Sequence, residues 1–241
     1  MISSDRLAHT SRWRTRSLAE KALLALGLLA LALALPPWPG GALVLATAIG
    51  AALAAGTPPV ALARLGLGPL AFILTGAATM VVQVDTGGLA LSAAGAQQAA
   101  QLVLRALAAV AALLLLTVTT PASDLIQGLR RLGLPAEVAE VALTTYRLLF
   151  VLLDTAGAIH ASQEARLGTT GWRRRIRSTG LLAGALLPRA LDRAHRLELG
   201  LAARGFDGSL RTLAPRRPVS PRGVAVITLL LVALGGAGSW M

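Results

Sequence analysis

Long apolar runs that are almost free of charge alternate along this chain with shorter polar stretches. A helix that crosses the hydrocarbon core of a bilayer needs about 20 mostly apolar residues. The segments that approach that length are residues 18–35, 41–55, 70–84, 98–119 and 223–238. The second and third are short, which a helix packed inside a bundle tolerates. The pattern predicts an all-α integral membrane protein with about five transmembrane helices, and it leaves counts of four or six open.

The segment between residues 121 and 220 has a different pattern, because charged residues recur there every few positions among apolar ones. Helices with one apolar face and one polar face give this pattern. We therefore expect three parts in the chain. They are N-terminal transmembrane helices over residues 1–120, with about four spans, long amphipathic helices on the cytoplasmic side over 121–220, and a C-terminal transmembrane helix over 221–241.

Two helices are predicted near the start of this middle segment. A short helix is expected over residues 125–132, capped by Ser123 or Asp124. Gly133 ends it, and Pro135 starts the next helix at a position where proline is tolerated.

The helix that Pro135 starts is expected to continue to about Ala165. Glu140, Arg147 and Asp154 follow one another at intervals of seven, so they share one face of this helix. The apolar stretch between the two acids is too short for a comfortable span, and a charge exposed to lipid at its centre would be costly. We interpret the segment as an amphipathic helix at the cytoplasmic interface. A sixth transmembrane helix with a buried ion pair is the alternative.

A basic stretch with an aromatic anchor follows over residues 172–177 and suits a layer of lipid headgroups. A second long amphipathic helix is expected over 178–204. Asp192 and Arg196 lie on it at a spacing of four, which weakly stabilises helices. Gly205 supplies the end of the helix, where a left-handed backbone is often needed.

The positions of Lys and Arg predict the orientation, because loops on the cytoplasmic side carry these residues. With five helices and a cytoplasmic N-terminus, the basic N-terminal stretch, Arg64 and residues 130–222 all lie inside. The loops at Trp38 and over residues 85–95 contain neither Lys nor Arg and then face outward. We expect a multi-pass protein of the plasma (inner) membrane with its C-terminus outside. Arg105 is the exception, expected near the outer start of the fourth helix or facing the bundle.

Composition argues against several other classes. The 23 Lys and Arg residues against 11 Asp and Glu give a net charge of +12, but they flank apolar spans, so anionic headgroups explain them better than nucleic acid does. The chain has no cysteine for a disulfide or a thiolate metal site. His9, His160 and His195 are scattered, and we expect no metal site. No P-loop and no catalytic set of residues occurs, so we expect a protein that is not an enzyme.

Two similar motifs end the two long amphipathic helices. Residues 163–168 read Gln-Glu-Ala-Arg-Leu-Gly, and residues 201–208 read Leu-Ala-Ala-Arg-Gly-Phe-Asp-Gly. At a helix end, a small Ala permits close approach, Arg offers a planar fork of donors, and Gly lets the backbone leave the helix. Such an end can fit a groove on a partner protein. The alternative is that each arginine only interacts favourably with the helix dipole.

These features, in this order, resemble the transmembrane coupling (T) components of energy-coupling factor (ECF) transporters, and most closely their cobalt-type CbiQ branch. The resemblance covers nearly the whole chain and is densest at residues 129–135, 145–147, 163–166 and 203–206. That family is marked by two Ala-Arg-Gly motifs on crossed cytoplasmic helices, which dock into grooves of two ATPase subunits.

The resemblance implies which residues contact the ATPases. The implied coupling residues are Ala165, Arg166, Ala203, Arg204 and Gly205. Leu167 stands where the first motif has a small residue, so Gly168 is the candidate to provide the turn instead. Supporting positions in the packing of the helices are assigned to Pro135, Tyr146, Arg147 and Asp154.

The resemblance also implies partners and a function. The partners are two ATP-binding cassette ATPase subunits, a substrate-binding S component of the CbiM type and a small accessory membrane subunit. ATP and Mg would lie on the ATPases, and this chain would hold no cofactor of its own. It would couple ATP hydrolysis to the uptake of cobalt or nickel. A T component of a vitamin importer is one alternative, and a secondary transporter, which needs ionisable residues at the bilayer midplane, is another.

Overall fold

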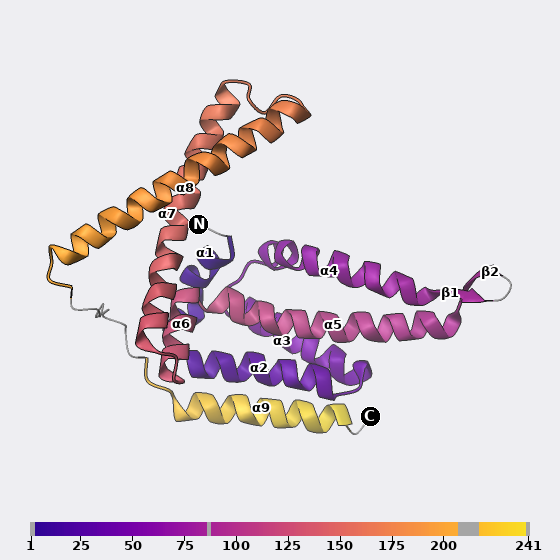
Figure 1. Cartoon of the computed structure of the whole chain (residues 1–241). Helices are drawn as coiled ribbons and strands as arrows, with labels where there is room; N and C mark the ends of the chain where they lie inside the picture. Colours follow the sequence, from indigo (N-terminus) through magenta and orange to yellow (C-terminus); the bar gives the residue numbers. More distant parts are fainter. Residues whose placement is uncertain (1–2, 86–87, 207–216, 240–241) are drawn as a thin grey trace. The chain divides into compact units, whose positions relative to one another are not determined.

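A computed structural model of the chain describes residues 3–85, 88–206 and 217–239 (Figure 1). The chain divides into two compact units. One contains residues 126–214, and the other contains residues 2–125 together with 215–241.

The larger unit is a bundle of helices. Its long helices are α2 (Leu18–Ala34), α3 (Ala42–Ala54), α4 (Pro59–Val81), α5 (Ala93–Thr119) and α9 (Pro221–Ser239). The helix α5 is central, because it packs against α2, α3 and α4, while α9 packs against α2 (Figure 1). The segments that are long and apolar enough to cross a membrane are Pro37–Ala54, Pro59–Val81, Ala93–Thr119 and Pro221–Gly238. This architecture confirms the predicted all-α integral membrane protein. The helix α2, which the sequence predicts as a further span, has 17 residues.

The helix α4 differs most from its prediction, which placed the third span over residues 70–84. It begins at Pro59 and contains Arg64 and Pro69. Proline is well suited to the first position of a helix, so Pro59 fixes the start. Arg64 is exposed, and a proline inside a helix that is packed among neighbours need not end it. The predicted start was therefore wrong.

A short β-hairpin that the sequence did not predict connects α4 to α5. Its strands are β1 (Val82–Asp85) and β2 (Gly88–Leu91), which pair antiparallel with Val82 opposite Leu91. The side chain of Ser92 then accepts a hydrogen bond from the Gly95 N–H and caps α5. The helix begins five residues before its predicted start at residue 98.

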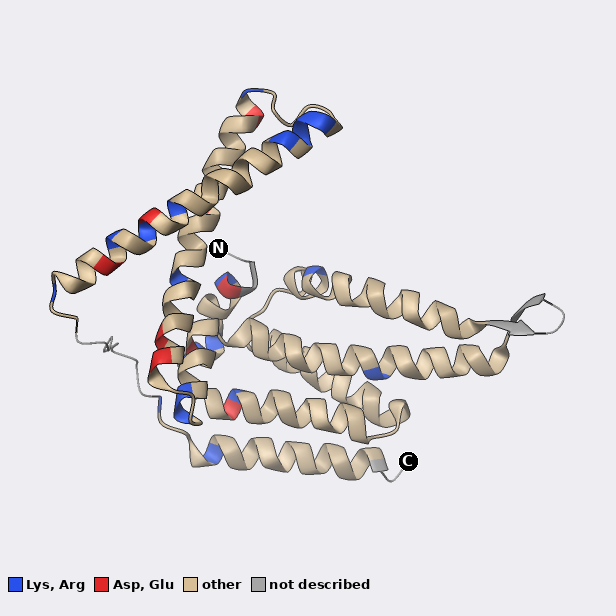
Figure 2. Ribbon diagram, in the orientation of Figure 1, with Lys and Arg blue, Asp and Glu red and all other residues tan. Residues whose placement is uncertain are grey.

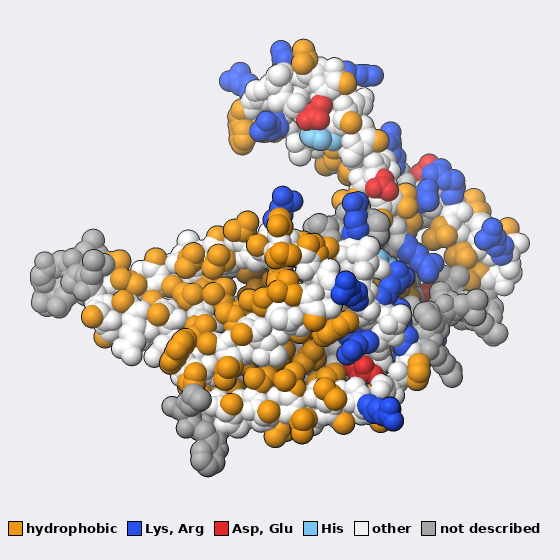
Figure 3. Space-filling view, turned by 180° about the vertical axis from the view of Figure 1, so that it is seen from behind, with side chains coloured by type: hydrophobic (Ala, Val, Ile, Leu, Met, Phe, Trp, Pro, Cys, Tyr) orange, Lys and Arg blue, Asp and Glu red, His pale blue; other side chains and the backbone are white. Residues whose placement is uncertain are grey.

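Small side chains make up much of the core of the bundle. The buried residues of the core are Leu24, Leu28, Ala32, Leu35, Val44, Ala48, Ala52, Ala108, Ala112, Leu115, Val118 and Ile227. Alanines at these positions let the helix backbones approach closely. Large apolar side chains point outward instead, with Phe72 81% exposed and Leu229 74% exposed. Figure 3 shows the resulting apolar surface over the bundle. A surface of this extent suits contact with lipid rather than with water.

Polar side chains join α2 to α5 at both ends of α2. Near its start, the Lys21 Nζ donates a hydrogen bond of 2.9 Å to the Thr119 carbonyl at the end of α5. Beyond its last residue, the Leu35 carbonyl accepts a hydrogen bond of 3.1 Å from Arg105 on α5. Both acceptors are carbonyls at helix ends, which have no partner within their own helix. Arg105 therefore faces the bundle, which is one of its two predicted places.

A second polar group joins α2 to the start of α9. The Glu20 carboxylate, on a residue that is 5% exposed, accepts a hydrogen bond of 2.8 Å from the Ser220 N–H just before α9. Nearby in sequence, Arg217 forms an ion pair of 2.7 Å with Asp124. Figure 2 shows the charged residues at the N-terminal ends of α2 and α9.

The segment before α2 is folded onto the bundle. It contains α1 (Ser3–Thr10) and the 3-10 helix η1 (Arg12–Thr15), neither of which the sequence predicted. The Ser11 hydroxyl and the Arg12 N–H both donate hydrogen bonds to the Ala55 carbonyl, at 3.1 and 2.9 Å. The N-terminal segment therefore caps the end of α3.

The second unit contains the end of α6 (Ala122–Arg131) and the long helices α7 (Ala136–Ala165) and α8 (Trp172–Ala202). The bounds predicted for α7 are confirmed. The helix α6 begins before Ser123 and Asp124, so both lie in its first turn and neither caps it.

The helix α8 begins at Trp172 rather than at residue 178, so the predicted start of this helix was wrong. Gly171 precedes it with a φ of 81°, which positions the chain for the new helix. Arginine is a good helix former, and a run of arginines therefore continues a helix without difficulty.

The N-terminal half of α8 is bonded to the end of α7. The Gln163 side-chain amide donates to the Ser178 carbonyl at 3.0 Å, and the Ser178 hydroxyl donates to the Gly168 carbonyl at 2.8 Å. The helix α7 has 30 residues and is not among the described segments that combine the length and hydropathy of a span.

Candidate coupling site

The helix α7 ends in a turn that satisfies its last free carbonyls. The Gly168 N–H donates to the Gln163 carbonyl at 2.8 Å, and the Leu167 N–H donates to the Glu164 carbonyl at 2.9 Å. These two bonds define a Schellman motif, in which the residue just after the helix takes a left-handed backbone. Arg166 is the last residue before that turn.

The helix α8 ends in the same way. The Phe206 N–H donates to the Leu201 carbonyl at 3.1 Å, and the Gly205 N–H donates to the Ala202 carbonyl at 3.1 Å. Arg204 is the last residue before the turn. The two motifs that the sequence singled out are therefore one structure repeated at two helix ends, with arginine at the same position in each.

The left-handed residue of the first turn is Leu167, with a φ of 57°, where the second turn has Gly205 with a φ of 68°. The expectation that Gly168 would provide this turn was therefore wrong. Gly168 is needed for a different reason. A Cβ atom there would lie 2.9 Å from both the Gln163 carbonyl oxygen and the Ser178 Oγ, which is too close.

Both arginines are exposed beside exposed apolar side chains. Arg166 and Arg204 form no ion pair with any residue that the structure describes. Leu167 is 64% exposed beside the first, and Phe206 is 41% exposed beside the second. A free guanidinium next to an apolar side chain is suited to a groove that has carboxylates or carbonyls at its rim and apolar walls. The sequence indicated the arginines, but it did not indicate these apolar neighbours.

The two helix ends are far apart. Because the end of α7 is bonded to Ser178, the distance between the two ends is set by the part of α8 from Ser178 to Ala202. At about 1.5 Å per residue, that part of the helix is about 36 Å long. A single pocket could not hold both arginines, whereas two partner subunits could each hold one.

The predicted supporting positions lie along α7. Pro135 is the residue that precedes its first turn. The Tyr146 ring makes an edge-to-face contact with the Phe150 ring, with centroids 4.9 Å apart. Arg147 and Asp154 are exposed. The Tyr146 contact lies within α7 itself, and the two charged residues lie on the surface of the unit.

A third helix end, that of α6, has the same turn. The Leu134 N–H donates to the Leu129 carbonyl at 3.1 Å, and the Gly133 N–H donates to the Arg130 carbonyl at 3.3 Å. Leu132, beside Gly133, is 86% exposed. The sequence predicted the end of α6 at Gly133, but nothing in the local pattern showed that Leu132 would be exposed.

The fold and these helix ends define a class of protein. It is a multi-pass membrane protein with a second unit of helices, two of which end in exposed arginines on turns with the same hydrogen bonds. Comparison with known proteins agrees with this description. Residues 10–214 match the model of the CbiQ family, described as cobalt transport protein.

Individual relatives support the same assignment. The chain is 47% identical to the cobalt transport protein CbiQ of Rhodobacter capsulatus over 239 residues, which cover 99% of this chain and 98% of that protein. It is 31% identical to CbiQ of Salmonella typhimurium over 86% of this chain and 98% of that protein. It is also 27% identical to a putative fused cobalt transport protein CbiMQ of Methanocorpusculum labreanum, over 70% of this chain and 30% of that protein. The chain belongs to the CbiQ family.

Proposed function

We propose that this chain is the transmembrane coupling subunit of an ATP-driven importer of the ECF type. In this proposal Arg166 and Arg204 each dock on one ATP-binding cassette ATPase subunit, which carries the ATP and Mg and performs the hydrolysis. The observation that carries the proposal is the repeated turn, because it presents one exposed arginine at each of two widely separated helix ends. This chain itself is not catalytic.

The connection between α7 and α8 supports a mechanical role. The bonds between Gln163, Gly168 and Ser178 join the end of one helix to the side of the other. A partner that displaces Arg166 therefore also displaces α8. When the two ATPases close on ATP, the two helices would move together and pass the displacement to a separate substrate-binding membrane subunit.

The proposed substrate is cobalt, with nickel as the related cation. Its support is the family, since relatives that match over nearly the whole chain are named cobalt transport proteins. A third relative is named as a putative fused protein, CbiMQ, and this name indicates that a CbiM part and a CbiQ part are joined in one chain. We therefore propose a CbiM-type protein as the substrate-binding partner, with a small accessory membrane subunit beside it.

The proposed topology has five spans, with α2 added to the four segments that meet the length of a span. Its support is that α2 packs between α5 and α9, both of which are themselves candidate spans. The N-terminus and the helices α7 and α8 then lie in the cytoplasm, and the C-terminus lies outside.

The test is copurification of the ATPases with the tagged chain. Arg204→Glu should reduce the recovered ATPase about 30-fold or more, because a central charged contact in an interface carries much of its energy. Arg193→Glu is the matched control, since Arg193 is exposed on the same helix away from the turn, and it should change recovery little. Stoichiometric recovery and normal cobalt uptake with Arg204→Glu would show that the role assigned to this arginine is wrong.

A further inference from the structure

Two neighbouring cavities lie at the end of the bundle where α2 and α9 begin. One, of about 330 Å³, is lined by residues of η1, α2, α3 and α9, and the other, of about 470 Å³, lies at the starts of α2 and α9. Residues that line both cavities are Arg16, Glu20, Val226 and Ile227. The two cavities therefore adjoin each other and share part of their lining, and together we call them the α2/α9 groove.

The α2/α9 groove is polar at its mouth and apolar below. The mouth includes Arg16, before the first turn of α2, and Arg222, in the first turn of α9. The deeper part is lined mainly by apolar side chains that lie further along the helices, among them Leu24 and Leu230, together with Lys21, whose Nζ already donates to the Thr119 carbonyl. The groove is therefore polar at the N-terminal ends of α2 and α9, and it becomes more apolar further along these two helices.

The mouth of the groove carries two arginines that can contact an anionic ligand. Arg16 and Arg222 are exposed and form no ion pair with the residues that the structure describes. Arg16 lies over the Trp13 ring at 5.0 Å, which holds the guanidinium at the mouth. Glu20 also lines the groove, but its carboxylate is buried and already accepts the Ser220 N–H.

We propose that the α2/α9 groove binds one anionic glycerophospholipid, with its phosphate at Arg16 and Arg222 and an acyl chain along Leu24, Ile227 and Leu230. A phospholipid matches the groove, because its anionic headgroup at the membrane interface would meet the basic mouth and its acyl chain would meet the apolar part below. Tryptophan is favoured at that interface, where Trp13 lies in this proposal. The proposal rests on the membrane location of the bundle and is independent of the ATPase docking.

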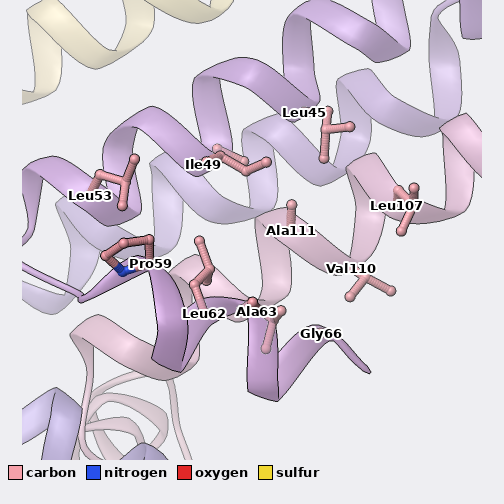
Figure 4. Close-up of a pocket in the computed structure, with 12 residues that line it drawn as sticks. Leu45, Ile49, Leu53, Pro59, Leu62, Ala63, Gly66, Leu107, Val110 and Ala111 are labelled. Atoms are coloured by element: carbon pink, nitrogen blue, oxygen red, sulfur yellow. The ribbon is translucent and has the colours of Figure 1, made fainter. Parts of the chain in front are cut away.

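A second groove provides the comparison that tests this assignment. It has a volume of about 300 Å³ and lies between α3, α4 and α5, lined by apolar residues such as Leu45, Ile49 and Val110 (Figure 4). It has no charged side chain in its lining. Gly50 lines the α2/α9 groove and Gly66 lines the second groove, and a Cβ atom at either position would meet nothing within 4 Å. Gly50→Leu and Gly66→Leu are therefore matched substitutions, each of which fills one groove.

The experiment uses the purified full chain in detergent, stripped of lipid, and native mass spectrometry with phosphatidylglycerol or phosphatidylcholine of the same acyl chains. The wild-type chain should retain one phosphatidylglycerol in preference to phosphatidylcholine. Arg16→Gln with Arg222→Gln should weaken phosphatidylglycerol binding about 30-fold, since each arginine near an anionic headgroup contributes about fivefold. Arg189→Gln with Arg193→Gln on α8 is the control and should leave binding unchanged. Circular dichroism confirms that each variant is folded.

The two glycine variants locate the acyl chain. Gly50→Leu should displace the bound phosphatidylglycerol, whereas Gly66→Leu should not. Equal retention of the two lipids by the wild-type chain, or unchanged binding after the double substitution of Arg16 and Arg222, would overturn the proposal. So would displacement by Gly66→Leu alone, because the acyl chain would then lie in the second groove.

Discussion

Leu167 and Gly205 occupy the same position in two turns that otherwise match, with φ values of 57° and 68°. Glycine takes this conformation without steric cost, whereas a side chain there crowds the following carbonyl. The first turn is therefore strained and the second is not. The strain at Leu167 is maintained by the two hydrogen bonds of the Schellman motif and by the contact of Gly168 with Ser178.

Exchanging the residue types at these positions should have opposite effects on stability. Gly205→Leu should destabilise the end of α8 by about 1–2 kcal/mol, which is the cost of a left-handed conformation for a side chain. Leu167→Gly should relieve that cost, partly offset by the greater freedom of glycine in the unfolded chain. Amide hydrogen exchange of the two turns measures both effects. Destabilisation by both substitutions to the same extent would contradict the assigned strain.

The exposed Leu167 side chain should contribute to ATPase binding if the proposed docking is correct. Leu167→Ala should weaken capture of the ATPase about tenfold, because burial of most of a leucine side chain is worth that much. Leu191→Ala is a matched control, since Leu191 is 59% exposed in the middle part of α8, between Ser178 and Ala202 and away from both turns. Equal losses for the two variants would show that Leu167 has no particular role. Binding assays with purified ATPase measure the difference.

Removal of the Lys21 ammonium should loosen the contact between α2 and α5. Lys21→Met keeps the aliphatic stem but leaves the Thr119 carbonyl, on a residue that is 1% exposed, without its donor. The expected destabilisation is about 1–3 kcal/mol, the usual cost of an unsatisfied buried polar group. Arg64→Met removes an exposed cation of the same unit and serves as the control. Thermal unfolding in detergent compares them, and equal midpoints would argue against the bond.

The ion pair between Asp124 and Arg217 should contribute less than the Lys21 bond. Its side chains are 22% and 21% exposed, so water and salt screen it in part. A double-mutant cycle with Asp124→Asn and Arg217→Gln should give a coupling of about 0.5–1 kcal/mol that falls at high salt. A coupling that does not change with salt would show that the pair is shielded from solvent.

The proposed topology can be tested with single cysteines, because the chain has none of its own. Trp38 is 75% exposed and Arg173 is exposed, so cysteines at these positions should be accessible. An impermeant thiol reagent added to intact cells should label Trp38→Cys and should label Arg173→Cys only after the membrane is opened. Labelling of Arg173→Cys in intact cells would contradict the five-span orientation.

Local patterns were sufficient to predict most of the helices and the ends of three of them. Gly133 and Gly205 end helices as predicted, because glycine is the residue that a left-handed turn prefers. Leu167 ends a helix in the same way, but its residue type gives no such signal. The start of α4 was missed for a related reason, since Arg64 and Pro69 look like interruptions until neighbouring helices are present.

Contacts between distant parts of the chain could not be predicted from the sequence. Lys21 and Thr119 are 98 positions apart, and Arg105 and Leu35 are 70 positions apart. Each bond depends on the way in which α2 packs against α5, which the apolar pattern of either helix leaves undetermined. The sequence indicated only that Arg105 needed an explanation. The two arginines of the proposed coupling site could be predicted because their motif is local, and their wide separation emerged only from the length of α8.

The attachment of α2 to α5 at both ends has a mechanical consequence. Two helices joined at a single point can rotate about that point, and two helices held only by apolar packing can slide along each other. With a bond near each end of α2, neither motion is possible without breaking a hydrogen bond to a helix-end carbonyl. The two helices should therefore tilt together as one body. In the proposed topology, a displacement of the cytoplasmic end of α5 would then move α2 with it.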